Sequence, residues 1–190
     1  KVIYLSDMTI YGWKTRIKEI RKEFGYTERE DLLSAKKLNS LLKKRGSKKQ
    51  LQKMIENKTV LIIGAGPSLS SSLAYVKKCK NVTKIVADGA VRGLLENGIK
   101  PDILVTDLDG DMKSIMKIGK TKIPIIVHAH GDNSDKLDMV RRFSNVIGST
   151  QTEPFGKMEN FGGFTDGDRC IFVAEYFNAK KNYFGRHGFW

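Results

Sequence analysis

Residues 60–78 read VLIIGAGPSLSSSLAYVKK, and this stretch decides the fold class. It joins a short apolar run, Val60–Ile63, to a glycine-containing loop, Gly64–Ser68, and then to a helical stretch, Leu69–Lys78. A continuous apolar run of this length predicts a strand that is buried on both faces, as strands of parallel sheets are. The stretch therefore predicts the first strand–loop–helix unit of an α/β domain.

The same unit recurs along the rest of the chain. Four more apolar runs follow, at Lys84–Ala87, Ile103–Thr106, Ile123–His128 and Asn145–Ser149. Helical stretches separate or follow them, at Gly89–Asn97, Asp111–Gly119, Ser134–Phe143 and 165–179. This alternation predicts an α/β fold with a mostly parallel sheet, helices on both faces and right-handed crossovers.

The first third of the chain has a different pattern. Apolar residues recur at steps of three and four over residues 8–24, 28–45 and 48–57, which predicts amphipathic helices. Gly25 and Gly46 stand where the first two helices are expected to end. We therefore expect a small helical cap over residues 1–57, followed by an α/β catalytic domain over residues 58–190.

The charge of the chain is basic and unevenly distributed. The 190 residues carry a formal net charge of +13, and residues 1–58 hold 16 Lys and Arg against 7 Asp and Glu. Because these charges fall on helical spacing with few aromatic residues between them, they favour a solvated helix face. A non-enzymatic nucleic-acid binder stays open as an alternative, and it would bind polyanions with a steep salt dependence.

Cysteine content and hydropathy restrict the type of protein. The two cysteines, Cys79 and Cys170, lack the spacing of a zinc site or a disulfide framework. No apolar run approaches the roughly 20 residues that a membrane helix needs. We therefore expect a cytoplasmic protein that makes no membrane contact, and the sequence leaves self-association open.

The glycine loop after the first strand predicts a phosphate site. Gly64 and Gly66 allow a ligand to approach the backbone, Pro67 suits the first turn of a helix, and Ser68 precedes that helix. Free N–H groups at a helix start attract phosphate. A dinucleotide site is an alternative, with Asp88 near the expected position of the acidic residue.

An aspartate-rich segment follows the third predicted strand. Four Asp fall within ten positions, at 102, 107, 109 and 111, and no Lys or Arg stands among them. Carboxylates this close repel one another unless they bind a cation or take up protons. Asp102 and Asp111 suit turns and helix caps, whereas Asp107 and Asp109 leave the strand together. With Asp132 from the next strand end, they predict a Mg²⁺ site.

Two further loops carry polar groups at the same predicted edge. His128 and His130 form a pair that a zinc or iron hydrolase could use, although packing of one of them beneath the loop is favoured. In the loop Gly162–Asp168, Thr165 or Asp166 is expected to cap the next helix. Arg169 could contact a phosphate or pair with Asp168.

Taken together, these motifs resemble the archaeal 6-hydroxymethyl-7,8-dihydropterin pyrophosphokinase family, which is related to thiamine pyrophosphokinase. The resemblance spans about Asn57 to Ala179, and the sequence after Ala179 departs from the family pattern. It rests on the motifs Gly64-Ala-Gly-Pro-Ser-Leu69, Ala87-Asp-Gly-Ala90, Pro101-Asp102, Thr106-Asp-Leu-Asp-Gly-Asp111, His128-Ala-His-Gly-Asp-Asn133, Thr150-Gln-Thr152 and Gly162-Gly-Phe-Thr-Asp-Gly-Asp168.

The resemblance implies an ATP- and Mg²⁺-dependent transfer of diphosphate to the hydroxymethyl group of the pterin, with release of AMP. It implies a thiamine pyrophosphokinase-like fold and a place in pterin and folate biosynthesis. The nucleotide would contact the Gly64–Ser68 loop, Asp88 and Arg92. The pterin would contact Thr150, Gln151, Thr152, Asn160, Gly163, Thr165 and Asp166. A related domain occurs in motility-associated glycosyltransferases that use nucleotide sugars, and that activity is the alternative.

Overall fold

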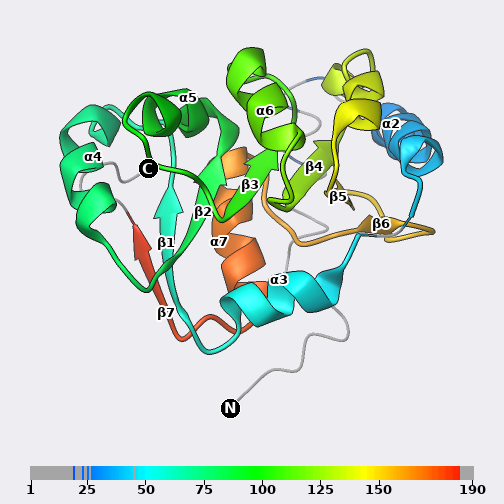
Figure 1. Cartoon of the computed structure of the whole chain (residues 1–190). Helices are drawn as coiled ribbons and strands as arrows, with labels where there is room; N and C mark the ends of the chain where they lie inside the picture. Colours follow the sequence, from blue (N-terminus) through cyan, green and yellow to red (C-terminus); the bar gives the residue numbers. More distant parts are fainter. Residues whose placement is uncertain (1–18, 20–22, 24, 26, 45, 185–190) are drawn as a thin grey trace.

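The computed structural model describes residues 19, 23, 25, 27–44 and 46–184. The helix that the sequence predicts over residues 8–24 therefore falls almost wholly outside the described residues. Within them, the chain forms a parallel seven-stranded sheet in the order β6-β5-β4-β3-β2-β1-β7 (Figure 1). The predicted α/β class is confirmed.

The strands are short and strongly apolar at the centre of the sheet. Their bounds are β1 Thr59–Ile63, β2 Thr83–Ala87, β3 Ile103–Thr106, β4 Ile125–Ala129, β5 Val146–Thr150, β6 Met158–Glu159 and β7 Lys181–Phe184. The five predicted strands are present, with shifts of one or two residues at their ends. Burial on both faces explains why their sequences are continuous apolar runs rather than alternating ones.

Six α-helices and two 3₁₀ helices surround this sheet in the described part of the chain. The α-helices are α2 Glu28–Leu41, α3 Lys48–Ile55, α4 Leu69–Lys78, α5 Asp88–Glu96, α6 Met112–Gly119 and α7 Asp166–Tyr176. The 3₁₀ helices are η1 Gly131–Asn133 and η2 Leu137–Arg142.

The continuous helix predicted over Ser134–Phe143 is wrong. Its backbone bonds instead span three residues, from Lys136 N to Asn133 O, from Met139 N to Lys136 O and from Phe143 N to Val140 O. Bonds of this spacing build short 3₁₀ pieces, which pack Leu137 and Val140 into the core. The apolar spacing in this segment is therefore real, but the backbone follows a tighter turn.

Two strands were not predicted, because neither has a continuous apolar sequence. β6 has two residues, and β7 contains Lys181 and Asn182 on the edge of the sheet next to β1. The departure of the sequence after Ala179 therefore does not remove a last strand, since Leu61 of β1 pairs in register with Tyr183 of β7. An edge strand keeps one side open to solvent and tolerates polar residues.

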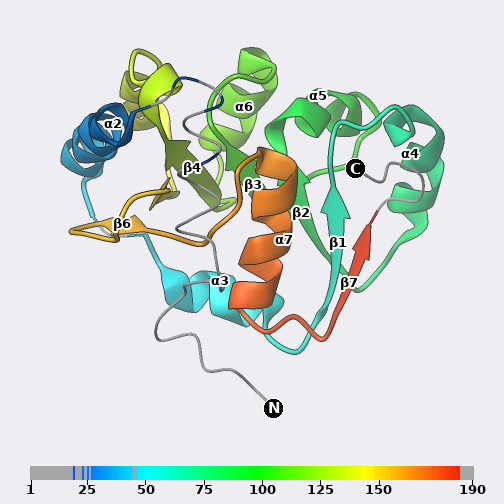
Figure 2. The same cartoon turned by 180° about the vertical axis from the view of Figure 1, so that it is seen from behind.

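Helices cover both faces of the sheet, as the two opposite views show (Figures 1 and 2). On one face, α3 and α7 pack against the strands through Leu51, Ile55 and Val173. On the other face lie α4, α5, α6, η2 and α2, whose Leu38 is completely buried. The helices α2 and α3 of the expected cap thus share hydrophobic cores with the α/β domain.

None of the helices in the described residues combines the length and the apolar character that crossing a membrane requires.

Candidate active site

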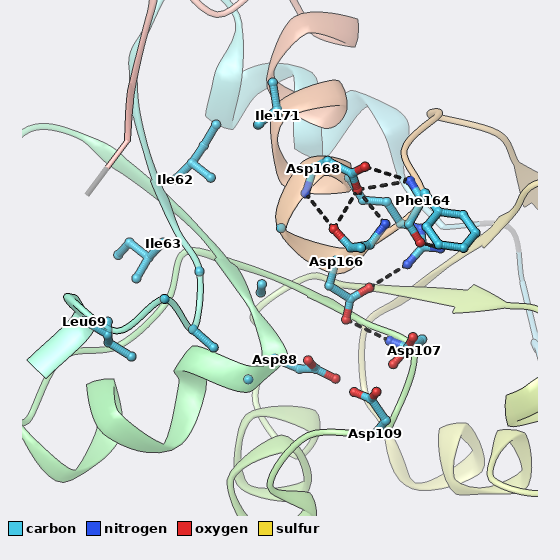
Figure 3. A pocket seen from close by; sticks show the side chains of 18 of the residues that line it. Ile62, Ile63, Leu69, Asp88, Asp107, Asp109, Phe164, Asp166, Asp168 and Ile171 are labelled. Carbon is cyan, nitrogen blue, oxygen red and sulfur yellow. Dashed lines mark hydrogen bonds and ion pairs between the residues drawn. The ribbon is translucent and has the colours of Figure 1, made fainter. Parts of the chain in front are cut away.

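A cleft of about 840 Å³ opens where the parallel strands end at their carboxyl edge (Figure 3). The loops that follow β1, β2, β3, β4 and β5 line it, together with the start of α7. This is where ligands bind in open α/β sheets. Its volume falls within the range of small-molecule pockets, roughly 300–1,000 Å³.

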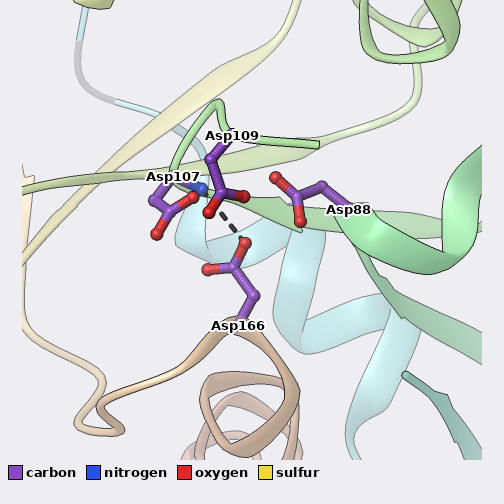
Figure 4. A group of neighbouring side chains, drawn as sticks. All are labelled: Asp88, Asp107, Asp109 and Asp166. Atoms are coloured by element: carbon purple, nitrogen blue, oxygen red, sulfur yellow. Dashed lines mark hydrogen bonds between the residues drawn. The ribbon is translucent and has the colours of Figure 1, made fainter. Parts of the chain in front are cut away.

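Four carboxylates meet in the floor of the cleft, and we call them the acidic cluster: Asp88, Asp107, Asp109 and Asp166. One oxygen from each lies within 4.8 Å of those of the other three. Asp88 begins α5, Asp107 and Asp109 follow β3, and Asp166 begins α7 from the other face of the sheet (Figure 4).

The turn after β3 directs two carboxylates into this cluster. Leu108 adopts a left-handed backbone conformation with φ 71°, which is unusual for a residue with a side chain. Its side chain is 1% exposed and packs in the core, and its N–H donates to Thr106 Oγ1 at 2.8 Å. Packing of Leu108 therefore compensates for the strained turn, and Asp107 and Asp109 both face the cluster.

Asp88 is fixed by the same turn. Its Oδ2 accepts hydrogen bonds from Thr106 Oγ1 at 2.7 Å and from Gly110 N at 3.2 Å. A Cβ at position 110 would lie 3.0 Å from Asp88 Cγ, so any larger residue would push the turn away from Asp88 by a few tenths of an ångström. The glycine in the Asp-Leu-Asp-Gly motif thus brings the turn against the start of α5.

Asp166 ties α7 to the end of β3. Its Oδ2 accepts a hydrogen bond from Asp107 N at 3.1 Å, and its Oδ1 accepts one from Arg169 Nη1 at 2.9 Å. Arg169 is 3% exposed, and its Nη2 donates to Phe164 O. Of the two alternatives for Arg169, pairing with Asp168 is therefore wrong, because Arg169 pairs with Asp166. Asp168 instead caps α7 by accepting from Thr165 N at 2.6 Å.

The segment after β4 holds Asp107 from the opposite side. His130 Nε2 lies 3.3 Å from Asp107 Oδ2, and Asn133 Nδ2 donates to Asp107 O at 2.7 Å. His130 lines the cleft, whereas His128 is buried below it with Nδ1 3.2 Å from Ser149 Oγ. One histidine of the pair is thus packed beneath the loop, as the sequence favours.

The carboxylates of the cluster have different pKa values because their surroundings differ. Burial alone would raise the pKa of Asp107, but hydrogen bonds with His130 and Asp109 and the charge of Arg169 lower it to about 2. Burial and the neighbouring Asp107 and Asp88 raise the pKa of Asp109 to about 6. Burial also holds the pKa of Asp166 well above its ordinary value, against the charge of Arg169. The cluster thus retains protons that a cation could displace.

The donor set fits a hard divalent cation such as Mg²⁺. Asp107 Oδ1 is buried and has no hydrogen-bond partner, although a buried carboxylate oxygen normally has one. Oxygen ligands from several carboxylates are what Mg²⁺ prefers. A buried oxygen without a partner on a carboxylate of this cluster indicates a position for a cation.

The Gly64–Ser68 loop forms the wall of the cleft beside this cluster. A Cβ at Gly64 or Gly66 would meet no other atom within 4 Å, so both glycines leave open space on the cleft side. Ser68 precedes α4, and its side chain makes no capping hydrogen bond. The loop therefore offers exposed backbone and a helix start without a side-chain cap, although Leu69 N donates to Gly66 O at 2.9 Å, and such a helix start can bind phosphate.

Most of the predicted site residues line the cleft, but they are grouped differently than expected. Asp132 lines the cleft outside the acidic cluster, while Asp88 and Asp166, which the sequence assigned to substrates, lie within it. The predicted residues that line the cleft are Gly64, Gly66, Pro67, Ser68, Asp88, Asp107, Asp109, Asp132, Gln151, Thr165 and Asp166.

Five predicted residues do not line the cleft. Arg92 is exposed and pairs with Glu96 at 2.8 Å, in a shallow groove beside α6. The other four hold loops: Thr150 bonds Thr152, Asn160 bonds Thr152 O, and Gly163 has φ 88° where a Cβ would strike Arg169. These contacts hold the loops beside the cleft, and a role of these four residues in substrate binding stays a prediction.

No separate role was predicted for several residues in and around the site. Lys136 and Asn133 line the cleft from the segment after β4, and Asn133 has a place in the sequence only as the last residue of the motif that begins at His128. Phe164 lines the cleft before α7, and Asp31 lies in α2, far away in sequence. A polar residue inside an apolar helix face is the signal that could have revealed Asp31.

Fold and site together define an α/β protein that holds a cation-suited acidic cluster beside a phosphate-suited glycine loop. A family model described as 6-hydroxymethylpterin diphosphokinase MptE-like matches residues 34–185. The chain belongs to this family, whose members are transferases.

Curated relatives agree with this assignment. A 6-hydroxymethyl-7,8-dihydropterin pyrophosphokinase of Pyrococcus furiosus is 46% identical over 174 residues, covering 89% of this chain and 73% of its own. The protein of the same name from Methanocaldococcus jannaschii is 39% identical, covering 92% of this chain and 77% of its own. The third, from Methanothermobacter thermautotrophicus, is 41% identical, covering 89% and 72%.

The fold also resembles a solved structure of a larger protein. The MAf glycosyltransferase from Magnetospirillum magneticum AMB-1 superposes with a TM-score of 0.58 at 16% identity, over 90% of this chain and 30% of that one. At this identity the likeness concerns the fold alone.

Proposed function

We propose that this chain transfers the β,γ-diphosphate of ATP to the hydroxymethyl oxygen of 6-hydroxymethyl-7,8-dihydropterin and releases AMP. Family membership and the named relatives support the reaction type and the acceptor. The observation that carries the proposal is the acidic cluster, which faces the Gly64–Ser68 loop across one cleft. A cytoplasmic location, as the sequence predicts, fits a reaction that consumes ATP.

The acidic cluster would hold Mg²⁺ through Asp107 and Asp109, with Asp88 and Asp166 beside them. When bound, the ion supplies positive charge that neutralises the phosphate oxygens during transfer. Asp107 is held for this role by His130 and Asn133, which fix its carboxylate and its carbonyl oxygen. Asp132, on the cleft wall, stays a proposed contact of the ion or its waters.

The donor nucleotide would lie along the Gly64–Ser68 loop. Backbone N–H groups there and at the start of α4 can donate to phosphate oxygens. Lys136 also lines the cleft and adds a positive charge. It lies close enough to Asp109 to offset part of the rise in the pKa of that carboxyl. In the described part of the chain it forms no ion pair within 4.0 Å, which leaves its ammonium group available to a phosphate.

The acceptor would bind between Gln151 and the Phe164–Asp168 segment. Phe164 offers an aromatic ring for a flat pterin, and Gln151, whose Nε2 donates to Asp31 Oδ2, lines the cleft beside it. In the reaction the hydroxymethyl oxygen bonds to the β-phosphorus, the bond from that phosphorus to the bridging oxygen of AMP breaks, and the hydroxyl proton is released. The chain's main contribution is to place these atoms in line.

Release of AMP from ATP tests this function directly. The reaction is run with Mg²⁺ and, in parallel, with 6-hydroxymethyl-7,8-dihydropterin or thiamine as acceptor. AMP that forms only with the pterin supports both the transfer and the acceptor. A folded protein that forms no AMP with either one, but turns over a nucleotide sugar, would overturn the proposal.

A further inference from the structure

A buried carboxylate on α2 links two loops of the site. Asp31 is 1% exposed, its Oδ1 accepts a hydrogen bond from Gly131 N at 3.0 Å, and its Oδ2 accepts one from Gln151 Nε2 at 2.6 Å. Gly131 follows β4 and Gln151 follows β5. A buried carboxylate is costly unless it is hydrogen-bonded, so movement of either loop away from Asp31 would be unfavourable. Asp31 therefore holds both loops in place.

The Gly131 contact leads on to the acidic cluster. Gly131 lies between His130, whose Nε2 is 3.3 Å from Asp107 Oδ2, and Asn133, whose Nδ2 donates to Asp107 O and to His128 O, each at 2.7 Å. A shift of the backbone at Gly131 would therefore move both groups that hold Asp107.

Helix α2 also packs directly on this segment. A Cβ at position 131 would lie 3.0 Å from Glu30 Cβ, so only a glycine fits there without movement. The other contact of Asp31, Gln151, lines the cleft from the next strand end. Helix α2 thus contacts both the Gly131 segment, which holds Asp107, and Gln151, which lies on the proposed acceptor side of the cleft.

We propose that Asp31 is a positioning residue of the site: through Gly131 it sets the groups that hold Asp107, and through Gln151 it sets the acceptor wall. The acceptor branch rests on the proposed function, whereas the Asp107 branch needs only that the acidic cluster binds a divalent cation. Asp31 contacts neither ligand and acts through the residues that do.

Asp31→Asn tests this role with little change in volume. The two N–H donors approach different oxygens of Asp31, and Asn replaces one of these oxygens with an NH₂ group, which turns a donor toward one of the two N–H groups. We expect affinity for Mn²⁺, measured by electron paramagnetic resonance on the metal-free protein, to fall ~10–100-fold, as when partners of metal ligands are lost. KM for the pterin should rise as well.

Two further variants separate the branches. Gln151→Met removes the amide that faces Asp31 Oδ2 and should raise KM for the pterin while Mn²⁺ affinity stays unchanged. The matched control is Asp138→Asn, which breaks another contact to α2, the Lys37 Nζ–Asp138 Oδ2 pair at 2.8 Å, at an exposed position. It should leave both quantities at the wild-type level.

The outcomes distinguish this inference from the proposed function. Wild-type Mn²⁺ affinity and wild-type KM in a folded Asp31→Asn protein would overturn the positioning role. If the wild-type protein does not act on the pterin, but Asp31→Asn still loses Mn²⁺ affinity, the proposed function fails and the link to Asp107 stands. If Asp31→Asn does not fold, Gly131→Ala decides, because it displaces the segment from α2, and unchanged Mn²⁺ affinity there overturns the role.

Discussion

The backbone N–H of Asp107 donates a hydrogen bond to Oδ2 of Asp166, 3.1 Å away, although the two residues are 59 positions apart. This bond joins the end of β3 to the first turn of α7. It is one of the contacts that bring carboxylates from both sides of the sheet into one cluster.

Asp107→Asn should abolish most turnover while the fold is kept. Because the pKa of Asp107 is lowered to about 2, the folded state favours its charged form, so the neutral Asn should lower the thermal midpoint modestly at neutral pH. Loss of a partner of a metal ligand already costs ~10–100-fold, so kcat should fall by at least that factor. AMP release and circular dichroism measure the two effects. Wild-type turnover in this variant would exclude Asp107 from the site.

The contribution of Asp109 to the stability of the metal-free protein should fall as the pH rises from about 4 to about 6, whereas buried His128, whose pKa is lowered, contributes in the opposite direction. The pKa of Asp109 is raised from 3.8 to about 6, so in this interval the folded state holds a proton that the unfolded state has released. Mg²⁺ competes with that proton, and its affinity should rise over the same interval.

Thermal denaturation at several pH values, with and without Mg²⁺, checks this dependence. The thermal midpoint of Asp109→Asn should fall less between pH 4 and 6 than that of the wild type. The contribution of Asp166 to the pH dependence remains in both proteins. Identical pH profiles for the two proteins would contradict the raised pKa of Asp109.

Gly66→Ala should weaken ATP binding and yet stabilise the protein. Gly66 does not have a positive φ, and its new methyl group would meet no atom within 4 Å. A compatible Gly→Ala change stabilises by about 0.4–1 kcal/mol. The methyl group would occupy the cleft wall, so KM for ATP should rise on the order of 10–100-fold.

Gly98→Ala is the matched control for that experiment. Gly98 also has open space around its Cβ position, but its φ is 72°, so the variant should lose stability and keep its KM for ATP. If Gly66→Ala leaves KM unchanged, the loop does not approach the nucleotide.

Lys136→Ala should raise KM for ATP roughly 10–100-fold, since a hydrogen bond to a charged group is worth about 1.5–3 kcal/mol. Arg92→Ala serves as the control, because Arg92 is an exposed cation outside the cleft and should have wild-type kinetics. A larger effect at Arg92 than at Lys136 would reverse this assignment of the phosphate-binding cation. Steady-state kinetics at varied ATP concentration decide between them.

The sequence by itself determined the fold class and the edge at which the site lies. Continuous apolar runs such as Val60–Ile63 predict buried parallel strands wherever they occur, because the pattern is local. Parallel strands end at one edge, so the loops after Ile63 and Thr106 had to meet there. The polar edge strand β7 escaped prediction because it has no continuous apolar run, and η2 was predicted as an α-helix because its apolar spacing does not distinguish an α-helix from 3₁₀ turns.

Only the tertiary structure decided which side chains share the acidic cluster. Asp166 reaches Asp107 because α7 crosses the opposite face of the sheet, a long-range arrangement that no local spacing encodes. Arg92 lies one turn into α5 and pairs outward with Glu96, whereas Asp88 at the start of that helix points into the cleft. Residue types were readable from the sequence, but their grouping depends on how distant elements pack.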